Sequence, residues 1–302
     1  MLPAATSTDA YQPRRPAREQ RIATAEGDIS VTQWGPDGAA PIVLLHGWMD
    51  CARGWQLLVD CLPEDWPLAA IDWRGYGQSE PRVDRYWLPD YLAELECVLQ
   101  QLWPAGHAGR IIGHSLGGTV GSAYAGIRTE RLKWLVNMEG FGLPRLDPKV
   151  IPEHLGQWLD ELRSPPGLRR YDSIEQLATV LQQRNPLLPM PNARYLAAVW
   201  TRPWADGVEL LADPRHRLST PLRLGREELQ ACWSRTIAPV LVLYGAESRA
   251  LPMAGGAAAV ERWRSLQSGL RVVGIEQAGH LLQHERPAAV AAQIIRFVAG
   301  LS

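Results

Sequence analysis

A glycine-rich segment between an apolar run and a helical pattern constrains the fold of this chain more than any other feature. The segment is GHSLGG at residues 113–118; it follows the apolar run 110–112 and precedes the helix-compatible stretch 118–127. A serine flanked by glycines two residues before and after it, at a strand-to-helix turn, is the pattern of a nucleophile elbow. The turn strains the serine backbone, and the glycines let strand and helix approach closely. The segment therefore predicts an α/β sheet with the Ser115 hydroxyl projecting above it.

Short apolar runs alternate with helical patterns along most of the chain. The runs are bounded by turn residues and show no polar alternation, which is typical of strands buried on both faces. Their alternation with helices predicts a doubly wound, mostly parallel eight-stranded sheet that begins with a hairpin. The expected strands are 21–25, 29–34, 41–45, 68–71, 110–112, 132–138, 239–244 and 270–275. The expected core helices are 55–62, 88–102, 118–127, 255–267 and 287–301.

The stretch 142–235 interrupts this alternation and predicts an inserted cap. It has no convincing strand pattern and contains amphipathic helical pieces such as 154–162 and 173–183. An insertion of this length between core strands would cover the carboxyl edge of the sheet, where ligands bind in open α/β folds. The expected organisation is a flexible N-terminal arm over 1–18, a core formed by 19–141 and 236–302, and a helical cap over 142–235.

Charge and cysteine usage limit the classes of partner. A net charge of −1 gives no electrostatic reason to expect nucleic acid or an anionic membrane as a partner. The four cysteines are scattered without C-x-x-C spacing, which argues against a zinc site and a disulfide framework and favours a reducing compartment. No apolar run approaches the ~20 residues of a membrane span, and the N-terminus lacks the pattern of a secretory signal. We expect a cytoplasmic protein that acts on a small molecule.

Tryptophan is unusually frequent, with 13 residues against two phenylalanines. Its large ring and single N–H group suit half-buried positions and cavity walls. Several tryptophans occur where a binding pocket would be lined, although core or boundary positions explain each of them equally well. The candidates are Trp48, Trp158, Trp200 and Trp204.

Two further segments that follow predicted strands add an oxyanion hole and a base. After the strand 41–45, the turn at Gly47 would direct the N–H of Trp48 at a developing oxyanion, and the N–H of Leu116 would be the second donor. His280 follows the strand 270–275 late in the chain, as a general base does in the order Ser, acid, His. His284 is the competing histidine, inside the following loop or helix.

Together these segments resemble the α/β-hydrolase superfamily over nearly the full length of the chain. The resemblance rests on His46-Gly47, on Asp72-x-Arg74-Gly75-x-Gly77-x-Ser79, on the elbow, and on Gly279-His280. It implies a catalytic triad without metal or cofactor. We interpret the loop 72–79 as support for the pocket, and we expect Asp50 and Asp72 to stabilise loops and turns.

The acid is the point at which the chain departs from the commonest pattern of this superfamily. Most members have an Asp three residues after the Gly that ends the seventh strand, and Ser248 occupies that position here. A serine cannot stabilise a histidine tautomer electrostatically. Glu139 follows the strand 132–138, 24 residues after Ser115, and the haloalkane-dehalogenase-like branch has its acid at that strand end. We favour Glu139, and Glu247, one residue short of the usual position, is the alternative acid.

The residue at the elbow indicates the reaction type. Dehalogenases and epoxide hydrolases have an Asp there, whereas Ser115 suits attack on an acyl carbon and an acyl-enzyme that water clears. The chain looks most like the serine-hydrolase-like subgroup, and we expect hydrolysis of a small to medium carboxylic ester. The alternatives are another acyl or C–C bond reaction (thioester, lactone, meta-cleavage product, acyl transfer) and a non-catalytic receptor on the same scaffold.

Arginines of the cap would favour the alternative of another acyl or C–C bond reaction if they bound a substrate carboxylate. A solvated helical face explains them more simply. They are Arg163, Arg169, Arg170, Arg194 and Arg202.

Overall fold

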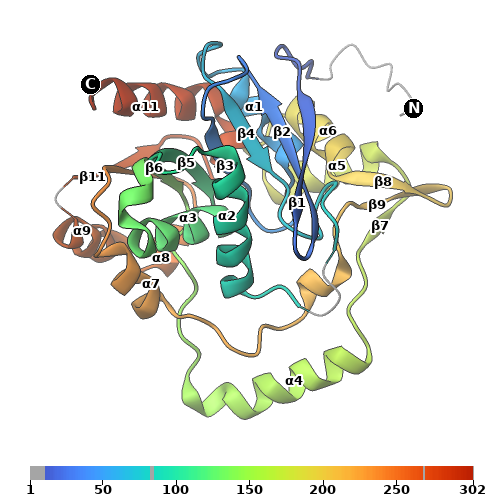
Figure 1. Ribbon diagram of the computed structural model, residues 1–302. Helices are drawn as coiled ribbons and strands as arrows, with labels where there is room; N and C mark the ends of the chain where they lie inside the picture. The colour runs from blue at the N-terminus through green and yellow to red at the C-terminus, as the bar shows by residue number, and fades with distance from the viewer. Residues whose placement is uncertain (1–10, 82–84, 268, 302) are drawn as a thin grey trace.

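The computed structural model describes residues 11–81, 85–267 and 269–301, and an eight-stranded sheet forms its centre (Figure 1). The order is β1-β2-β4-β3-β5-β6-β10-β11; β1 and β2 form an antiparallel hairpin, β2 pairs antiparallel with β4, and the remaining pairs are parallel. The predicted doubly wound sheet is thereby confirmed. Its strands are β1 (Arg18–Thr24), β2 (Gly27–Trp34), β3 (Ile42–Leu45), β4 (Leu68–Ile71), β5 (Gly109–His114), β6 (Leu132–Met138), β10 (Val240–Gly245) and β11 (Leu270–Ile275).

Helices cover both faces of the sheet. Successive strand residues point to opposite faces, so Val43 and Leu45 pack with the helices α2, α3 and α9, whereas Ile42 and Leu44 pack with α1, α10 and α11. Each fully buried side chain of this kind contributes about 1.5–3 kcal/mol relative to an exposed one. The helices are α1 (Gln56–Val59), α2 (Leu88–Leu102), α3 (Leu116–Ile127), α8 (Ala250–Met253), α9 (Gly256–Leu266), α10 (Leu282–Glu285) and α11 (Pro287–Ala299).

The expected cap region contains strands as well as helices, which corrects the expectation of an insertion without strands. A small antiparallel sheet has the order β7-β9-β8. Its strands have two to four residues, too few to produce a recognisable periodicity. The elements are α4 (Ile151–Arg163), β7 (Arg170–Tyr171), α5 (Ile174–Arg184), α6 (Met190–Val199), β8 (Thr201–Trp204), β9 (Gly207–Leu210) and α7 (Arg226–Trp233).

The parts of this region pack differently. Helices α5 and α6 share an apolar cluster with Cys51 and Leu57 of the core, and α7 lies against the core helix α3. Helix α4 buries none of its residues and lies apart from the sheet (Figure 1). The side chain of His154 on α4 contacts the carbonyl of Thr220, and Glu161 accepts hydrogen bonds from Ser219. These hydrogen bonds therefore connect helix α4 to the segment around Ser219 and Thr220 rather than to the core.

The N-terminal segment 11–17 is not the loose arm expected from the sequence. The backbone N–H groups of Arg14 and Arg15 donate to the carboxylate of Asp60, at 2.8 and 2.9 Å, and the Arg15 side chain is buried among backbone carbonyls. Residues 1–10 of the expected arm lie outside the described residues. Within the described ranges, no helix is both long and apolar enough to cross a membrane.

Candidate active site

Ser115 lies at the sharp turn between β5 and α3. Its φ of 51° and ψ of −111° are strained for a residue with a side chain, and its N–H donates to the carbonyl of Met138 at 2.8 Å. A Cβ on Gly113 would lie 2.5 Å from the Gly117 oxygen, and a Cβ on Gly117 would lie 2.1 Å from the Leu45 oxygen. Both glycines are therefore needed for helix and strand to approach closely enough to form the elbow.

Ser115, His280 and Glu139 form a continuous hydrogen-bonded chain. His280 Nε2 lies 3.1 Å from Ser115 Oγ, and His280 Nδ1 lies 3.0 Å from Glu139 Oε2. The carboxylate can only accept, so Nδ1 carries the proton and Nε2 is free to accept the serine proton. The side chain of Glu139 is fully buried, whereas that of His280 is 44% exposed. The arrangement is a hydroxyl, a base open to a substrate, and a buried orienting carboxylate.

Two other groups donate hydrogen bonds to the Glu139 carboxylate. The N–H of Gly245 donates to Oε1 at 2.9 Å, and the Ser248 hydroxyl donates to Oε2 at 2.6 Å. Ser248, at the position where most members of the superfamily have an Asp, thus donates to the carboxylate of Glu139, which directly follows β6. The side chain of Glu247 is exposed, and no hydrogen bond among the described residues joins it to His280. Of the two candidate acids, the structure brings only Glu139 to the histidine.

Backbone strain is concentrated at this site. Five described non-glycine residues have a positive φ, and the values at Met49, Ser115 and Glu139 are 59°, 51° and 59°. Gln277, with a φ of 54°, precedes His280 by three residues. Such conformations persist only where the surrounding structure enforces them, and they are frequent at functional sites. This signal is absent from the sequence, because none of the four is a glycine.

The turn that follows β3 lies directly against the nucleophile. A Cβ on Gly47 would lie 2.9 Å from His114 Nδ1 and 3.2 Å from Ser115 Cβ, so only glycine fits without displacement. Among the described residues, neither the Trp48 N–H nor the Leu116 N–H has a hydrogen-bond acceptor. Two free amides beside a nucleophile have the arrangement of an oxyanion hole. The Trp48 side chain is 56% exposed.

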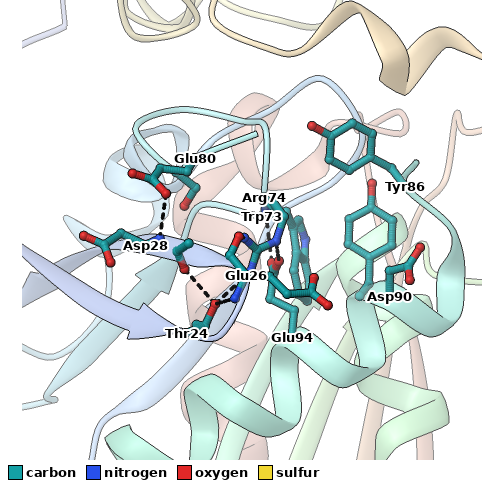
Figure 2. Close-up of polar contacts among 12 residues, drawn as sticks. Thr24, Glu26, Asp28, Trp73, Arg74, Glu80, Tyr86, Asp90 and Glu94 are labelled. Atoms are coloured by element: carbon teal, nitrogen blue, oxygen red, sulfur yellow. Dashed lines mark hydrogen bonds and ion pairs between the residues drawn. The ribbon is translucent and has the colours of Figure 1, made fainter. Parts of the chain in front are cut away.

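The loop after β4 supports the neighbouring segments. Asp72 accepts hydrogen bonds from the N–H groups of Ala52 at 2.6 Å and Gln78 at 3.0 Å. Arg74 reaches from this loop between the β1–β2 hairpin and α2 (Figure 2), where its Nε lies 3.0 Å from Glu94 Oε2. Both charged side chains are buried, and breaking one partner of such a pair is strongly destabilising. These contacts agree with a supporting role.

The candidate pocket tryptophans lie in different environments. Trp200 is buried, and its Nε1 donates to Asp50 Oδ1 at 2.6 Å. Trp158 is on α4, which buries nothing. Trp204 is 43% exposed and lies beneath the guanidinium of Arg170, 4.1 Å from the ring centroid. The Trp204 ring, at the end of β8, therefore packs against a side chain of β7 in the same small sheet, and a pocket-lining role for these tryptophans stays a prediction.

Several cap arginines bind carboxylates of the protein itself. Arg194 pairs with Glu175 at 3.0 Å, and Arg202 and Arg170 pair with Glu209 at 2.8 and 3.6 Å. Arg163 is exposed, and Arg169 lies over the ring of Tyr171. These pairs give no support to a substrate carboxylate site in the cap.

Two features of the site were not predicted from the sequence. His114, beside the nucleophile, is buried, and its Nε2 lies 2.8 Å from the carbonyl of His280. Burial, reinforced by His280 and His284, holds the pKa of His114 well below its ordinary value, so the ring is neutral. His284, the competing base, has no hydrogen bond to Ser115 among the described residues and pairs with Asp50 at 3.0 Å. No cluster of His, Cys, Asp or Glu within the described ranges could bind a metal ion.

Known proteins share this fold. The chain matches the family described as alpha/beta hydrolase fold over residues 40–287. It is 36% identical over 132 residues to a serine hydrolase-like protein of Danio rerio, a match that covers 43% of this chain and 40% of that protein. It is 25% identical over 262 residues to a 2-(acetamidomethylene)succinate hydrolase of Mesorhizobium japonicum, covering 86% and 89% of the two chains.

A solved structure agrees with this assignment at the level of the fold. The thioesterase domain from the curacin biosynthetic pathway superposes with a TM-score of 0.78 at 23% identity, over 93% of this chain and 99% of that domain. The match to the Danio rerio relative spans well under two thirds of that relative's length. From the match over residues 40–287 and the sheet topology, the chain belongs to the α/β-hydrolase fold family.

Proposed function

We propose that this protein is a serine hydrolase that cleaves a small to medium carboxylic ester through an acyl-enzyme. The observation that carries the proposal is the chain of contacts from Ser115 Oγ through His280 to Glu139, at 3.1 and 3.0 Å. It lies beside two unpaired amides and is open to solvent through His280. A hydroxyl with an adjacent oriented base is the arrangement required for attack on an acyl carbon.

The first half of the reaction forms the acyl-enzyme. Ser115 Oγ attacks the acyl carbon while its proton moves to His280 Nε2, and the buried Glu139 carboxylate stabilises the resulting imidazolium. The amides of Trp48 and Leu116 stabilise the oxyanion, and each such donor contributes about 10²–10³ in rate. His280 then returns the proton to the leaving alcohol as the C–O bond breaks.

The second half clears the acyl-enzyme. Water gives a proton to His280 Nε2 and attacks the acyl carbon, and the same two amides stabilise the second oxyanion. Ser115 recovers its proton from His280 as the carboxylic acid leaves. The residues already named supply every proton transfer in this sequence.

Labelling and turnover test the proposal together. An alkyl fluorophosphonate should react with Ser115 in the native protein and not in Ser115→Ala. Turnover of p-nitrophenyl esters should fall in that variant by up to about 10⁶, with an unchanged unfolding temperature. Turnover within tenfold of the native rate would contradict the nucleophile assignment. A panel of esters of rising chain length, with matched thioesters and lactones, distinguishes ester hydrolysis from the other acyl reactions.

A further inference from the structure

The turn that carries the Trp48 amide is fastened to the cap at two points. The indole Nε1 of Trp48 donates to the carbonyl of His216, in the 3-10 helix η4 (Pro214–Arg217), at 3.1 Å. Asp50 Oδ1 accepts from the indole Nε1 of Trp200, at the end of α6, at 2.6 Å. Between these two points lies Met49, with its positive φ of 59°. Hydrogen bonds to the cap therefore hold the strained turn on both sides of Met49.

The Asp50 carboxylate joins three segments that are distant in the sequence. Oδ1 also accepts from the N–H of Cys51 at 2.7 Å, and Oδ2 lies 3.0 Å from His284 Nε2. Asp50, His284 and Trp200, which we call the Asp50 cluster, are all buried. Burial alone would raise the pKa of the Asp50 carboxyl, but the charge and hydrogen bond of His284 hold it below its ordinary value. The carboxylate is therefore ionised and can accept all three hydrogen bonds.

The cluster also adjoins the segment that carries the base. His284 follows His280 by four residues, and its backbone carbonyl accepts a hydrogen bond from Asn192 of α6 at 2.8 Å. The ring of His114 lies 4.9 Å from that of His280 and 6.5 Å from that of His284, between centroids. A displacement of α6 would consequently act on both the oxyanion turn and the base segment.

We propose that Asp50 is a positioning residue, and that the Asp50 cluster sets the Trp48 amide and the His280 segment according to the position of the cap helix α6. The proposal rests on the proposed hydrolase function. A displacement of about 1 Å at a reacting group lowers the rate about 10²-fold. A stable fold does not require an ion pair at this place, because well-packed apolar side chains of similar volume often replace a buried ion pair without loss.

Two variants weaken the contacts of the Asp50 cluster, one at the carboxylate and one at the indole donor. Asp50→Asn keeps the shape of the side chain and removes its charge, and Trp200→Phe keeps an aromatic ring in the cap and removes the Nε1 donor. Trp34→Phe is the matched control, because Trp34 is also buried and its Nε1 donates to Gln56 Oε1 at 2.8 Å, in a different part of the core. The readouts are the rate of Ser115 labelling by an alkyl fluorophosphonate and the kcat and KM for p-nitrophenyl acetate.

In the labelling reaction, the bond from Ser115 Oγ to phosphorus forms, fluoride leaves, and the serine proton passes to His280, so the rate depends on the oxyanion amides and the base. We expect labelling and kcat to fall about tenfold to a hundredfold in Asp50→Asn and Trp200→Phe, with KM changed by less than about threefold. The double variant should be no slower than the slower single variant, because both changes disrupt one cluster. Trp34→Phe should keep the native rates.

The outcomes separate the two proposals. Failure of the native protein to react with the fluorophosphonate contradicts the proposed function, and the positioning role with it. Native labelling together with native rates in folded Asp50→Asn and Trp200→Phe overturns the positioning role alone. An equal loss of rate in Trp34→Phe would also overturn it, since the effect would then follow from any lost buried indole contact. If Asp50→Asn does not fold, Trp200→Phe decides the question.

Discussion

Two buried carboxylates of this protein each bind an imidazole at the same distance, yet only one of the two imidazoles also contacts a hydroxyl and solvent. Glu139 Oε2 lies 3.0 Å from His280 Nδ1, and Asp50 Oδ2 lies 3.0 Å from His284 Nε2. The two pairs differ at the second ring nitrogen. His280 Nε2 contacts Ser115 Oγ and its side chain is 44% exposed, whereas His284 is 1% exposed and its Nδ1 has no partner among the described residues.

This difference shows that a carboxylate–imidazole pair is not by itself a catalytic device. The carboxylate orients the ring in both cases, but a base must also reach a nucleophile and a substrate. Asp50 and His284 are both buried, so their contact is closed to a substrate. It holds the turn after β3 against α10. The comparison therefore predicts that changes at the two histidines will affect different properties of the protein.

The largest effect is expected at His280. His280→Gln should lower ester turnover by about 10⁶, with little change in unfolding temperature, because the side chain is partly exposed. His284→Phe leaves the buried Asp50 carboxylate without its partner and should lower the free energy of unfolding by about 3–5 kcal/mol, with a loss of turnover no greater than about 10². Thermal melts and kcat measured on the same preparations test this contrast. Equal losses of turnover in both variants would abolish it.

The next effect is expected at the acid. Glu139→Gln keeps the size of the side chain but removes the charge that stabilises the imidazolium, and turnover should fall by about 10⁴. Glu247→Gln is the matched control and should keep the native rate, because its side chain is exposed and lies outside the hydrogen-bonded chain. Steady-state kinetics of both variants decide between them. Full activity of Glu139→Gln with an inactive Glu247→Gln would reverse the assignment of the acid.

The pH dependence of stability extends the comparison to three buried histidines with no hydrogen bond to a carboxylate among the described residues. Burial lowers the pKa of His46, His114 and His216, the last to about 3. Below pH ~6.5 the unfolded chain binds protons that these folded rings do not bind, so stability falls as the pH decreases, by about 1.4 kcal/mol per pH unit for each ring. Burial raises the pKa of Asp72 and Glu285, which reduces this slope from about pH 4 upward.

Thermal melts between pH 7.5 and 5.5 test this expectation. The unfolding temperature should decrease steadily over that interval, because three histidines outnumber the two opposing carboxyls. His216→Phe keeps the ring that stacks between Tyr76 and Tyr86 and removes one titrating group, so its unfolding temperature should depend less steeply on pH. An unfolding temperature that rises toward pH 5.5 would show that these rings are not neutral in the folded protein.

The same contrast explains how far the sequence predicts the site. The elbow could be predicted because its glycines are required by local backbone geometry, and the structure brings Ser115, His280 and Glu139 together. The Asp50 cluster could not be predicted, because it joins α6, α10 and the turn after β3 by side chains without a local pattern. The environments of the tryptophans could not be predicted for a related reason: a tryptophan looks the same in sequence whether it faces a pocket or packs against an arginine of a small sheet.

The smallest effect is expected at Ser248, whose hydroxyl donates to the same Glu139 oxygen that contacts His280. Ser248→Ala removes this donor and leaves the Gly245 N–H on the other oxygen, so the carboxylate stays in place with more of its charge directed at the imidazole. We expect turnover within about tenfold of the native rate and an acidic limb of the kcat/KM profile that moves to higher pH.

Ser122→Ala is the control for this prediction. It removes a buried hydroxyl that is bound to Asn137, and it should leave the pH profile unchanged. A limb that moves to lower pH, or a loss as large as that of Glu139→Gln, would mean that Ser248 acts by fixing the acid in place and not by tuning its charge.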